Sequence, residues 1–402
     1  MKKLLILGAG IYQVPLIEKA REMGLYTIAA SYSGNYPGLA LADEVWNVDT
    51  RDFETLIQLS RSAGIAGVCT SGTDVAIISL GAICESLGLS GLSLDCAKTV
   101  TDKASMKEAF QTAGTSTPRF YKVSSLAEAL KAFEHLGSPV IVKAVDSSGS
   151  RGITKAETLQ EVETAWKSAM NVTQKDYVLV EEFITAHEIG VDGFIYKGQI
   201  QFMLPHDKFT LTTNGTTLPE GHHFPFHCSE TLYSEILHQM NLVVQATGMD
   251  NCAVNADILV SGSKAWVLEA GGRAGATCIP ELISCYCGFD YYQQMILQAL
   301  GETPDFSFTR ELPCMAKLLF CKHQGVITGI DEETLLNLGT SGLRISLDYP
   351  VGTQVEAVQN GTSRIGQVIM ETDDVAKLDK AMDQVRSAIW IDGVSLETLW
   401  NE

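Results

Sequence analysis

Short apolar runs alternate with amphipathic stretches over residues 1–95. The stretches have the spacing of helices, and the runs have the length of strands. The strand-like runs are 3–7, 26–30, 44–47 and 65–70. Because strands and helices take turns along this segment, we expect an N-terminal α/β domain built on a parallel, doubly wound sheet.

The same two patterns occur in a less regular order from residue 96 to residue 311, which predicts two α+β units, at 96–184 and 185–311. The expected helices are 94–110, 125–136, 159–170 and 230–247. The expected strands are 120–122, 138–143, 177–182, 188–195, 199–204, 252–260 and 264–269, with a loop rich in Thr, Gly and His after the fifth of them.

Residues 312–402 are rich in strand-like runs, at 315–321, 325–330, 342–347, 354–358 and 366–371, and one helical run follows at 374–389. We expect a small β-rich C-terminal domain here. The fold class is therefore α/β and α+β, with several domains along the 402 residues.

Composition and charge narrow the possible functions. The net charge of −19 argues against a grip on the phosphate backbone of nucleic acid, but a few local cations can still hold a nucleotide. Ten scattered cysteines are typical of buried thiols in a reducing compartment. The start MKKLLILGAG resembles a signal peptide, but its glycines end the apolar run at once. No run approaches the roughly 18 apolar residues that cross a bilayer. We expect a cytoplasmic protein without membrane partners.

A glycine turn follows the first predicted strand. It has Gly8 and Gly10 of a GxGxxG motif, with Gln13 in place of the third glycine. A dinucleotide site would also need an acidic residue at the end of the second strand, which ends instead in Ala29-Ala30-Ser31. NAD binding by an oxidoreductase is one interpretation, and a structural or substrate-side turn is the other.

Two further segments have the residue types that bind a nucleotide. Lys143 ends an apolar strand and precedes a loop of Ser, Gly and Arg at 146–152, where backbone N–H groups can approach phosphate oxygens. The strand 178–184 ends in Glu181 and Glu182, which could face an adenine edge and a ribose. A plain turn and a solvated acidic turn are the alternatives for these two segments.

The strongest signal is a predicted hairpin with an acid on each strand. Asp257 and Glu269 lie almost opposite each other when the turn falls at Ser261-Gly-Ser263. Two facing carboxylates repel unless a cation neutralises them, and Mg²⁺ takes carboxylate ligands together with phosphates. Arg273 could steady a substrate carboxylate or the charge that develops during transfer. A surface salt-bridge cluster is the alternative.

Taken together, these residues resemble the ATP-grasp superfamily, in its order and approximate spacing, well over residues 1–300 and more loosely beyond. The resemblance implies a pre-grasp domain at 1–95, two ATP-grasp subdomains at 96–184 and 185–311, and a C-terminal domain at 312–402. It also implies roles for individual residues in binding ATP: Lys103 and Lys143 as phosphate lysines; Ser147, Ser148, Gly149, Ser150 and Gly152 in the closing glycine-rich loop; Glu181, Glu182, Phe183 and Ile184 at the adenine; and Glu188 at the ribose. Asp257 and Glu269 match the metal ligands, for Mg²⁺ or alternatively Mn²⁺, and Arg273 the arginine of the E-x-N-x-R signature.

The chain departs from that signature at Gly271, where the family has Asn, so water or a residue such as Asn255 must replace one metal contact. This departure keeps a catalytically silent nucleotide-binding protein as an alternative.

Within the superfamily, the chain looks most like the L-amino-acid ligase and carbamoyl-phosphate-synthase-like branch, judged on 351–352 and 364–369. Ligases of that kind join a carboxylate to an amine through an acyl phosphate. A purine-pathway ligase, such as phosphoribosylamine–glycine ligase or carboxyaminoimidazole ribonucleotide synthase, is the alternative.

Three histidines, His206, His222 and His223, lie where such enzymes bind the second substrate. They could orient an amine or act as a base, because the unperturbed pKa of histidine suits that role. Polar lid residues are the alternative. We expect small-molecule carboxylate and amine partners, and a homodimer as the commonest assembly.

Overall fold

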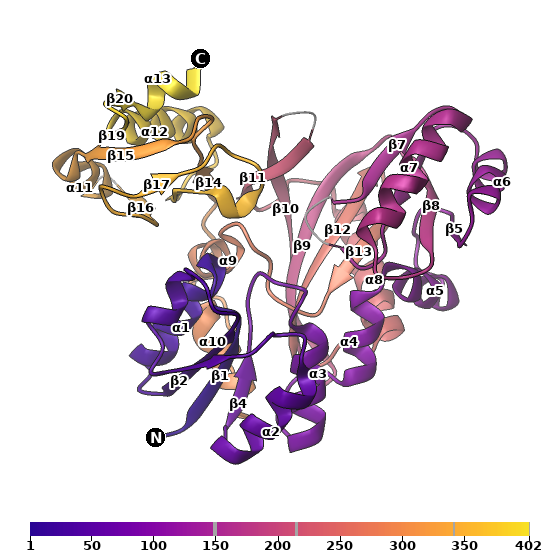
Figure 1. The fold of residues 1–402 in the computed structure, drawn as a ribbon, viewed down its shortest axis with the longest axis horizontal. Coiled ribbons are helices and arrows are strands. Elements are labelled where there is room, and N and C mark those ends of the chain that lie inside the picture. Colours follow the sequence, from indigo (N-terminus) through magenta and orange to yellow (C-terminus); the bar gives the residue numbers. More distant parts are fainter. Residues whose placement is uncertain (148–150, 214–215, 341, 402) are drawn as a thin grey trace. The chain divides into compact units, whose positions relative to one another are not determined.

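The computed structural model describes residues 1–147, 151–213, 216–340 and 342–401 (Figure 1). The chain forms two compact units. Unit 1 comprises residues 1–205, 227–274 and 292–304, and unit 2 comprises residues 206–226, 275–291 and 305–402. The finer division into four domains stays a prediction.

Unit 1 begins with the parallel sheet that the alternating pattern predicted. Its four strands, in the order β3-β2-β1-β4, are β1 (Lys3–Leu7), β2 (Tyr26–Ser31), β3 (Glu44–Asn47) and β4 (Gly67–Cys69). The helices among them are η1 (Ile11–Gln13), α1 (Val14–Glu22), η2 (Pro37–Ala40), α2 (Phe53–Ala63) and α3 (Ile77–Leu87). Apolar side chains of β1 and β2 are fully buried, as a strand covered on both faces requires.

An antiparallel sheet follows, in the order β5-β8-β6-β7. Its strands are β5 (Phe120–Val123), β6 (Val140–Lys143), β7 (Ile153–Ala156) and β8 (Val178–Glu182), and its helices are α6 (Leu126–Leu136) and α7 (Leu159–Val172). Small and β-branched residues fill the layer between sheet and helices. Figure 1 shows both helices beside this sheet.

The helix expected at 94–110 is wrong as a single element. The structure has α4 (Leu94–Thr101) and α5 (Lys103–Ala113), which are separated by Asp102 in an extended conformation. The Asp102 carboxylate caps α5 by accepting two backbone N–H groups of its first turn, both at 2.9 Å. The apolar spacing continues across the break, which hides it in the sequence.

The last sheet of unit 1 contains the predicted acidic hairpin. Its order is β13-β12-β9, followed by residues 199–205 of β10. The elements are β9 (His187–Tyr196), β10 (Gln199–Thr213), β12 (Cys252–Ser261), β13 (Lys264–Gly271), α8 (Glu230–Thr247) and α10 (Tyr291–Ala299). The backbone of Ala299 lies so close to β4 that a Cβ on Gly67 would stand 2.4 Å from its carbonyl oxygen.

Unit 2 has two sheets. One consists of residues 206–213 of β10 and then β11 (Thr216–Phe224), β14 (Cys314–Leu319), β18 (Gly366–Met370) and β16 (Leu343–Leu347), in that order. The other has the order β17-β15-β19-β20, with β15 (Gly325–Ile330), β17 (Gln354–Val355), β19 (Ile389–Ile391) and β20 (Val394–Ser395). The helices are α9 (Ile279–Cys287), α11 (Glu332–Thr340), η3 (Gly361–Ser363), α12 (Val375–Ser387) and α13 (Leu396–Asn401).

Two expectations for unit 2 are corrected. The stretch after residue 204 is not a loop, because β10 and β11 form an antiparallel hairpin there. Helices α9, α11 and α13 were not predicted, although the β-rich character and α12 were. None of the described helices combines the length and apolar character that a bilayer crossing needs.

Candidate active site

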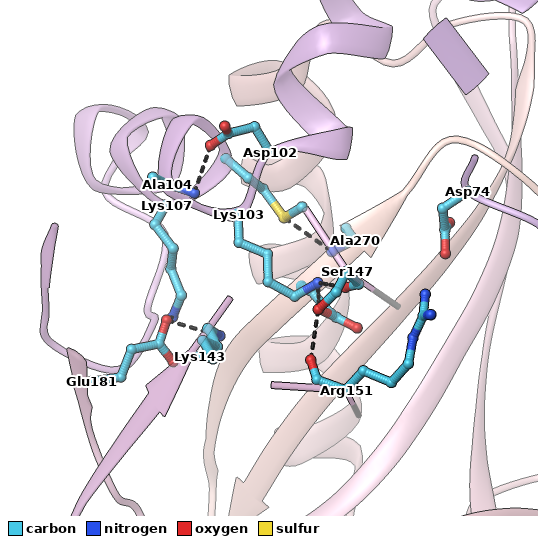
Figure 2. Close-up of polar contacts among 12 residues, drawn as sticks. Asp74, Asp102, Lys103, Ala104, Lys107, Lys143, Ser147, Arg151, Glu181 and Ala270 are labelled. Carbon is cyan, nitrogen blue, oxygen red and sulfur yellow. Dashed lines mark hydrogen bonds and ion pairs between the residues drawn. The ribbon is translucent and has the colours of Figure 1, made fainter. Parts of the chain in front are cut away.

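A buried glutamate joins two buried lysines in unit 1 (Figure 2). Oε1 of Glu181, on β8, lies 2.8 Å from Nζ of Lys143 and 3.3 Å from Nζ of Lys107. Lys143 ends β6, which pairs with β8, whereas Lys107 reaches the carboxylate from α5. All three residues are at most 5% exposed, so their attraction is screened little by water.

These contacts determine the charge of each group. Burial raises the pKa of the Glu181 carboxyl, but the charges of Lys143 and Lys107 outweigh it, so the pKa lies below its ordinary value. Burial lowers the pKa of Lys107 to about 8, because Glu181 offsets only part of the desolvation and Lys143 adds a like charge. Lys107 was not identified from the sequence. The one sequence feature that points to it is its place four residues after Lys103, on the same helix face.

Lys103 connects the start of α5 with the acidic hairpin. The cap at Asp102 makes Lys103 the first helical residue. Its Nζ lies 3.0 Å from Oε2 of Glu269 and donates a 2.8 Å hydrogen bond to the backbone oxygen of Ser147. Burial lowers the pKa of Lys103, but the charge of Glu269 outweighs it, so the pKa is raised and the lysine is charged.

The sequence placed Asp257 and Glu269 almost opposite each other in the acidic hairpin. In the structure, Asp257 of β12 is directly paired with Glu269 of β13, because a bulge between Asp257 and Ile258 shifts the register by one residue. Both acids are half-buried. Two facing carboxylates on the same hairpin are the oxygen donors that Mg²⁺ takes, so the donor set fits a divalent cation held by these residues. Within the described contacts, Lys103 neutralises part of this charge.

Arg273 lies in a chain of polar contacts that runs from Asp74 to Asp192. Its Nε and Nη2 donate to the two carboxylate oxygens of Asp74, at 2.7 and 3.0 Å. Its Nη1 donates to Oδ1 of Asn255 at 2.7 Å, and the Asn255 amide donates to the fully buried Asp192 at 2.9 Å. Burial lowers the pKa of Arg273, but Asp74 outweighs burial and raises it. Asp74, on the segment after β4, was not singled out from the sequence, because nothing local distinguishes it.

The departure at Gly271 leaves room for a side chain. A Cβ there would lie 3.4 Å from Oδ1 of Asp74, which is ordinary van der Waals contact. Asn255, which the sequence suggested as a replacement metal contact, pairs with Gly271 across the hairpin and has its amide between Arg273 and Asp192. A metal contact by Asn255 stays a prediction.

The structure describes the two ends of the predicted phosphate loop. Ser148, Gly149 and Ser150 lie outside the described residues. The Ser147 hydroxyl donates to the backbone oxygen of Arg151 at 2.6 Å. Gly152 has φ +69°, a left-handed conformation that suits glycine, and its carbonyl accepts the Ala144 N–H at 2.9 Å.

The predicted adenine and ribose contacts begin on β8 and continue after it, because Glu181 and Glu182 belong to that strand and Glu181 is buried with the two lysines. Glu182 is paired with Arg119 at 2.6 Å, whereas the ring of Phe183 lies 4.6 Å from Nζ of Lys155. Ile184 is half-buried, and Glu188 is exposed near the start of β9. The nucleotide-binding roles of these residues stay predictions.

The three histidines lie on the β10–β11 hairpin of unit 2. His206 and His222 are buried, with ring centroids 4.7 Å apart, and His206 also stacks on Phe224 at 4.5 Å. Burial lowers the pKa of His222 well below its ordinary value, so its ring is neutral. Nε2 of His223 lies 2.8 Å from Oδ1 of Asp373. Burial of two of the rings does not favour the alternative of polar lid residues, and a substrate-binding role stays a prediction.

The side chain of Gln13 fills the glycine turn after β1. Oε1 of Gln13 accepts the Gly10 N–H at 2.8 Å, and Nε2 of Gln13 donates to the backbone oxygen of Ser71 at 2.5 Å. A bound diphosphate would need that same N–H group. The contacts therefore favour the structural interpretation of this turn over a dinucleotide site.

Comparison with known proteins finds a matching family model, related ligases and a shared fold. The family model of the ATP-grasp domain matches residues 108–191. Alanine–anticapsin ligase of Bacillus subtilis is 24% identical over 300 residues, which are 66% of this chain and 62% of that ligase. The chain thus spans less than two thirds of that relative's length.

Two solved structures are similar over almost the whole chain. Phosphoribosylglycinamide synthetase from Anaerococcus prevotii superposes with a TM-score of 0.80 and 29% identity, covering 97% of this chain and 99% of that one. The biotin carboxylase domain of 2-oxoglutarate carboxylase from Hydrogenobacter thermophilus, solved with MgADP as a dimer, has a TM-score of 0.81 and 18% identity. It covers 100% of this chain and 94% of that one, and at this identity it shows the fold alone.

Proposed function

We propose that the chain is a ligase of the ATP-grasp family that joins an amino-acid carboxylate to an amine through an acyl phosphate. The observation that carries this proposal is the contact of Lys103 with both Glu269 and Ser147. It links a helix start, the acidic hairpin and the glycine-rich loop. These are three elements that a triphosphate and its metal would need together.

In this proposal, Lys103, Lys143 and the backbone N–H groups of the glycine-rich loop hold the phosphates of ATP. Asp257 and Glu269 would hold Mg²⁺, which when bound neutralises phosphate oxygens. Phosphoryl transfer depends mainly on positioning and on charge, so no protein nucleophile is needed. Glu182, Phe183 and Ile184 would contact adenine and Glu188 the ribose, whereas the Glu181 side chain is buried against Lys143 and Lys107.

The chemistry has two steps. A carboxylate oxygen of the first substrate attacks the γ-phosphorus of ATP, and the bond to the bridging oxygen of ADP breaks. The amine nitrogen of the second substrate then attacks the carbonyl carbon, phosphate leaves, and the nitrogen loses a proton to solvent. Arg273 would orient the substrate carboxylate or offset the charge that develops there. Residues 146–152 would close over the site and exclude water from the acyl phosphate.

Two substrate classes are supported by different relatives. Alanine–anticapsin ligase supports amino-acid substrates, which we favour because they agree with the branch that the sequence resembles. Phosphoribosylglycinamide synthetase, at 29% identity, supports a purine-pathway ligase as the second candidate. Pocket shape distinguishes such substrates by only about 1–3 kcal/mol per methylene, so a panel must decide.

We propose the four domains at 1–95, 96–184, 185–311 and 312–402, Mn²⁺ as a substitute for Mg²⁺, and a homodimer as the assembly. We also propose the cytoplasm as the location. Ten free thiols support it, because cysteines remain unpaired in a reducing compartment.

The test is ADP release by the purified chain with Mg²⁺ over paired amino acids and over phosphoribosylamine with glycine. Glu269→Gln should reduce amine-dependent ADP release by on the order of 100-fold, because one charge of the metal site is lost. Nucleotide binding, measured by calorimetry, should only weaken.

The matched control is Glu163→Gln, which removes an exposed α7 carboxylate paired with Lys167 and should leave turnover unchanged. ADP release by Glu269→Gln equal to that of the unmodified chain would refute the metal assignment. Binding of MgATP without turnover on any substrate pair would instead support the catalytically silent alternative.

A further inference from the structure

Lys107 has no role in the proposed reaction, although it is a fully buried amine beside the proposed phosphate lysine. Its Nζ lies 3.3 Å from Oε1 of Glu181, the same oxygen that Lys143 contacts at 2.8 Å. Nζ also donates to the Thr117 hydroxyl at 2.5 Å. One carboxylate therefore serves two lysines (Figure 2).

Folding stability alone does not explain this arrangement. A buried charge destabilises a fold unless it is fully compensated, and apolar residues of similar volume often replace buried ion pairs without loss of stability. A single lysine would already pair with Glu181. The second lysine brings the formal charge of the three groups to +1, whereas Glu181 and Lys143 alone would be neutral.

We propose, resting on the proposed function, that Lys107 is a positioning residue that shares Glu181 with Lys143 and thereby keeps net positive charge available for the nucleotide phosphates. Without Lys107, Glu181 would pair with Lys143 alone and draw the ammonium toward β8. Lys107 would then be required for nucleotide affinity although it does not itself contact the nucleotide.

A second contact couples Lys107 to the hairpin. The Thr117 hydroxyl that accepts from Lys107 donates to the backbone oxygen of Val267 at 2.7 Å. Val267 lies on β13, two residues before Glu269. The same amine thus connects the strand that carries Glu181 with the strand that carries a proposed metal ligand.

The charge of Lys107 is sensitive to pH in an accessible range. The charged groups that act on it are Glu181 on β8, Lys143 on β6 and Glu269 on β13. Burial lowers the pKa of Lys107 to about 8, so its positive charge is lost as the pH rises through that value. Arginine cannot lose its charge in this range.

The experiment is calorimetric titration of MgADP into the full chain from pH 7.0 to pH 9.5, for the unmodified chain, Lys107→Arg and Lys107→Met. For the unmodified chain, affinity should fall by on the order of tenfold across pH 8, because one nearby charge is lost. Lys107→Arg should bind tightly with no such step. Lys107→Met should bind on the order of tenfold more weakly at pH 7.0, also without the step.

The outcomes separate this inference from the proposed function. Absence of MgADP binding by the unmodified chain at every pH would refute the proposed function itself. Binding by Lys107→Met with the affinity and pH profile of the unmodified chain would refute the role of Lys107 alone. If Lys107→Met fails to fold by circular dichroism, the comparison of Lys107→Arg with the unmodified chain decides, and a pH step retained in Lys107→Arg overturns the inference.

Discussion

At the scale of single residues, several charged side chains of the proposed site are held in place by charged or polar partners. Arg273 is clamped by both oxygens of Asp74 and is connected through Asn255 to the buried Asp192. Such a guanidinium keeps one orientation because several partners constrain its planar fork. A substrate carboxylate would therefore meet a preorganised cation, which reduces the entropy lost on binding.

Asp74→Asn should destabilise unit 1, because it leaves Arg273 with one charge fewer to offset its burial. We expect a loss of about 1–2 kcal/mol in the free energy of unfolding, less than for a fully buried pair because the Asp74 side chain is 36% exposed. Urea unfolding followed by circular dichroism measures it. Turnover should fall as well, since Arg273 loses its fixed orientation.

Glu163→Gln is the matched control for this prediction. Glu163 pairs with Lys167 on α7 and both side chains are exposed, so its loss should change the free energy of unfolding by no more than about 0.5 kcal/mol. Equal destabilisation by the two variants would contradict a special role for the Asp74–Arg273 pair.

At the scale of secondary structure elements, the sequence predicted best where local signals agree. The hairpin β12–β13 was predicted from apolar alternation around a Ser-Gly-Ser turn, but the bulge that brings Asp257 directly opposite Glu269 was not. The break at Asp102 was missed because apolar spacing runs through it, although an aspartate before a helical run is a capping signal.

The hairpin β10–β11 was missed for another physical reason. Histidines occupy inward positions that normally carry apolar residues. The alternation of apolar and polar residues that marks a strand is therefore absent from the sequence. Lys107 was missed likewise, because a buried lysine and an exposed one look the same on a helix. Long-range contacts decide such positions, and a single sequence does not display them.

The buried His222 should make the chain less stable in acid. Its folded pKa lies well below the value of 6.5 that it has when exposed, so below about pH 6.5 the unfolded chain binds a proton that the folded chain does not. His222 therefore does not lower the free energy of unfolding above about pH 6.5, and it lowers it increasingly as the pH falls below that value. His222→Gln should reduce the fall in Tm between pH 7.5 and pH 5.5 by roughly 1–3 °C.

Differential scanning calorimetry at the two pH values measures this effect. His238→Gln, at an exposed position on α8, is the control and should behave as the unmodified chain does. An unchanged fall in Tm for His222→Gln would show that His222 does not carry the acid sensitivity.

At the scale of the whole molecule, charge is distributed unevenly. The chain has a net charge of −19, yet Lys103, Lys107 and Lys143 gather around Glu181 and Glu269. Lysines gathered at one place inside an acidic protein can hold a polyanion of small size while the protein as a whole repels long ones. This agrees with a nucleotide ligand, and it is the property that the sequence-level charge already suggested.

The central claim is that the carboxylate substrate receives the γ-phosphoryl group before the amine attacks. The most direct measurement uses an amino acid with ¹⁸O at both carboxylate oxygens, incubated with the chain, MgATP and the amine that supports turnover. Mass spectrometry of the released phosphate should find one ¹⁸O atom per turnover, because the attacking oxygen leaves with the phosphate. Unlabelled phosphate at the same rate of ADP release would contradict the acyl phosphate mechanism.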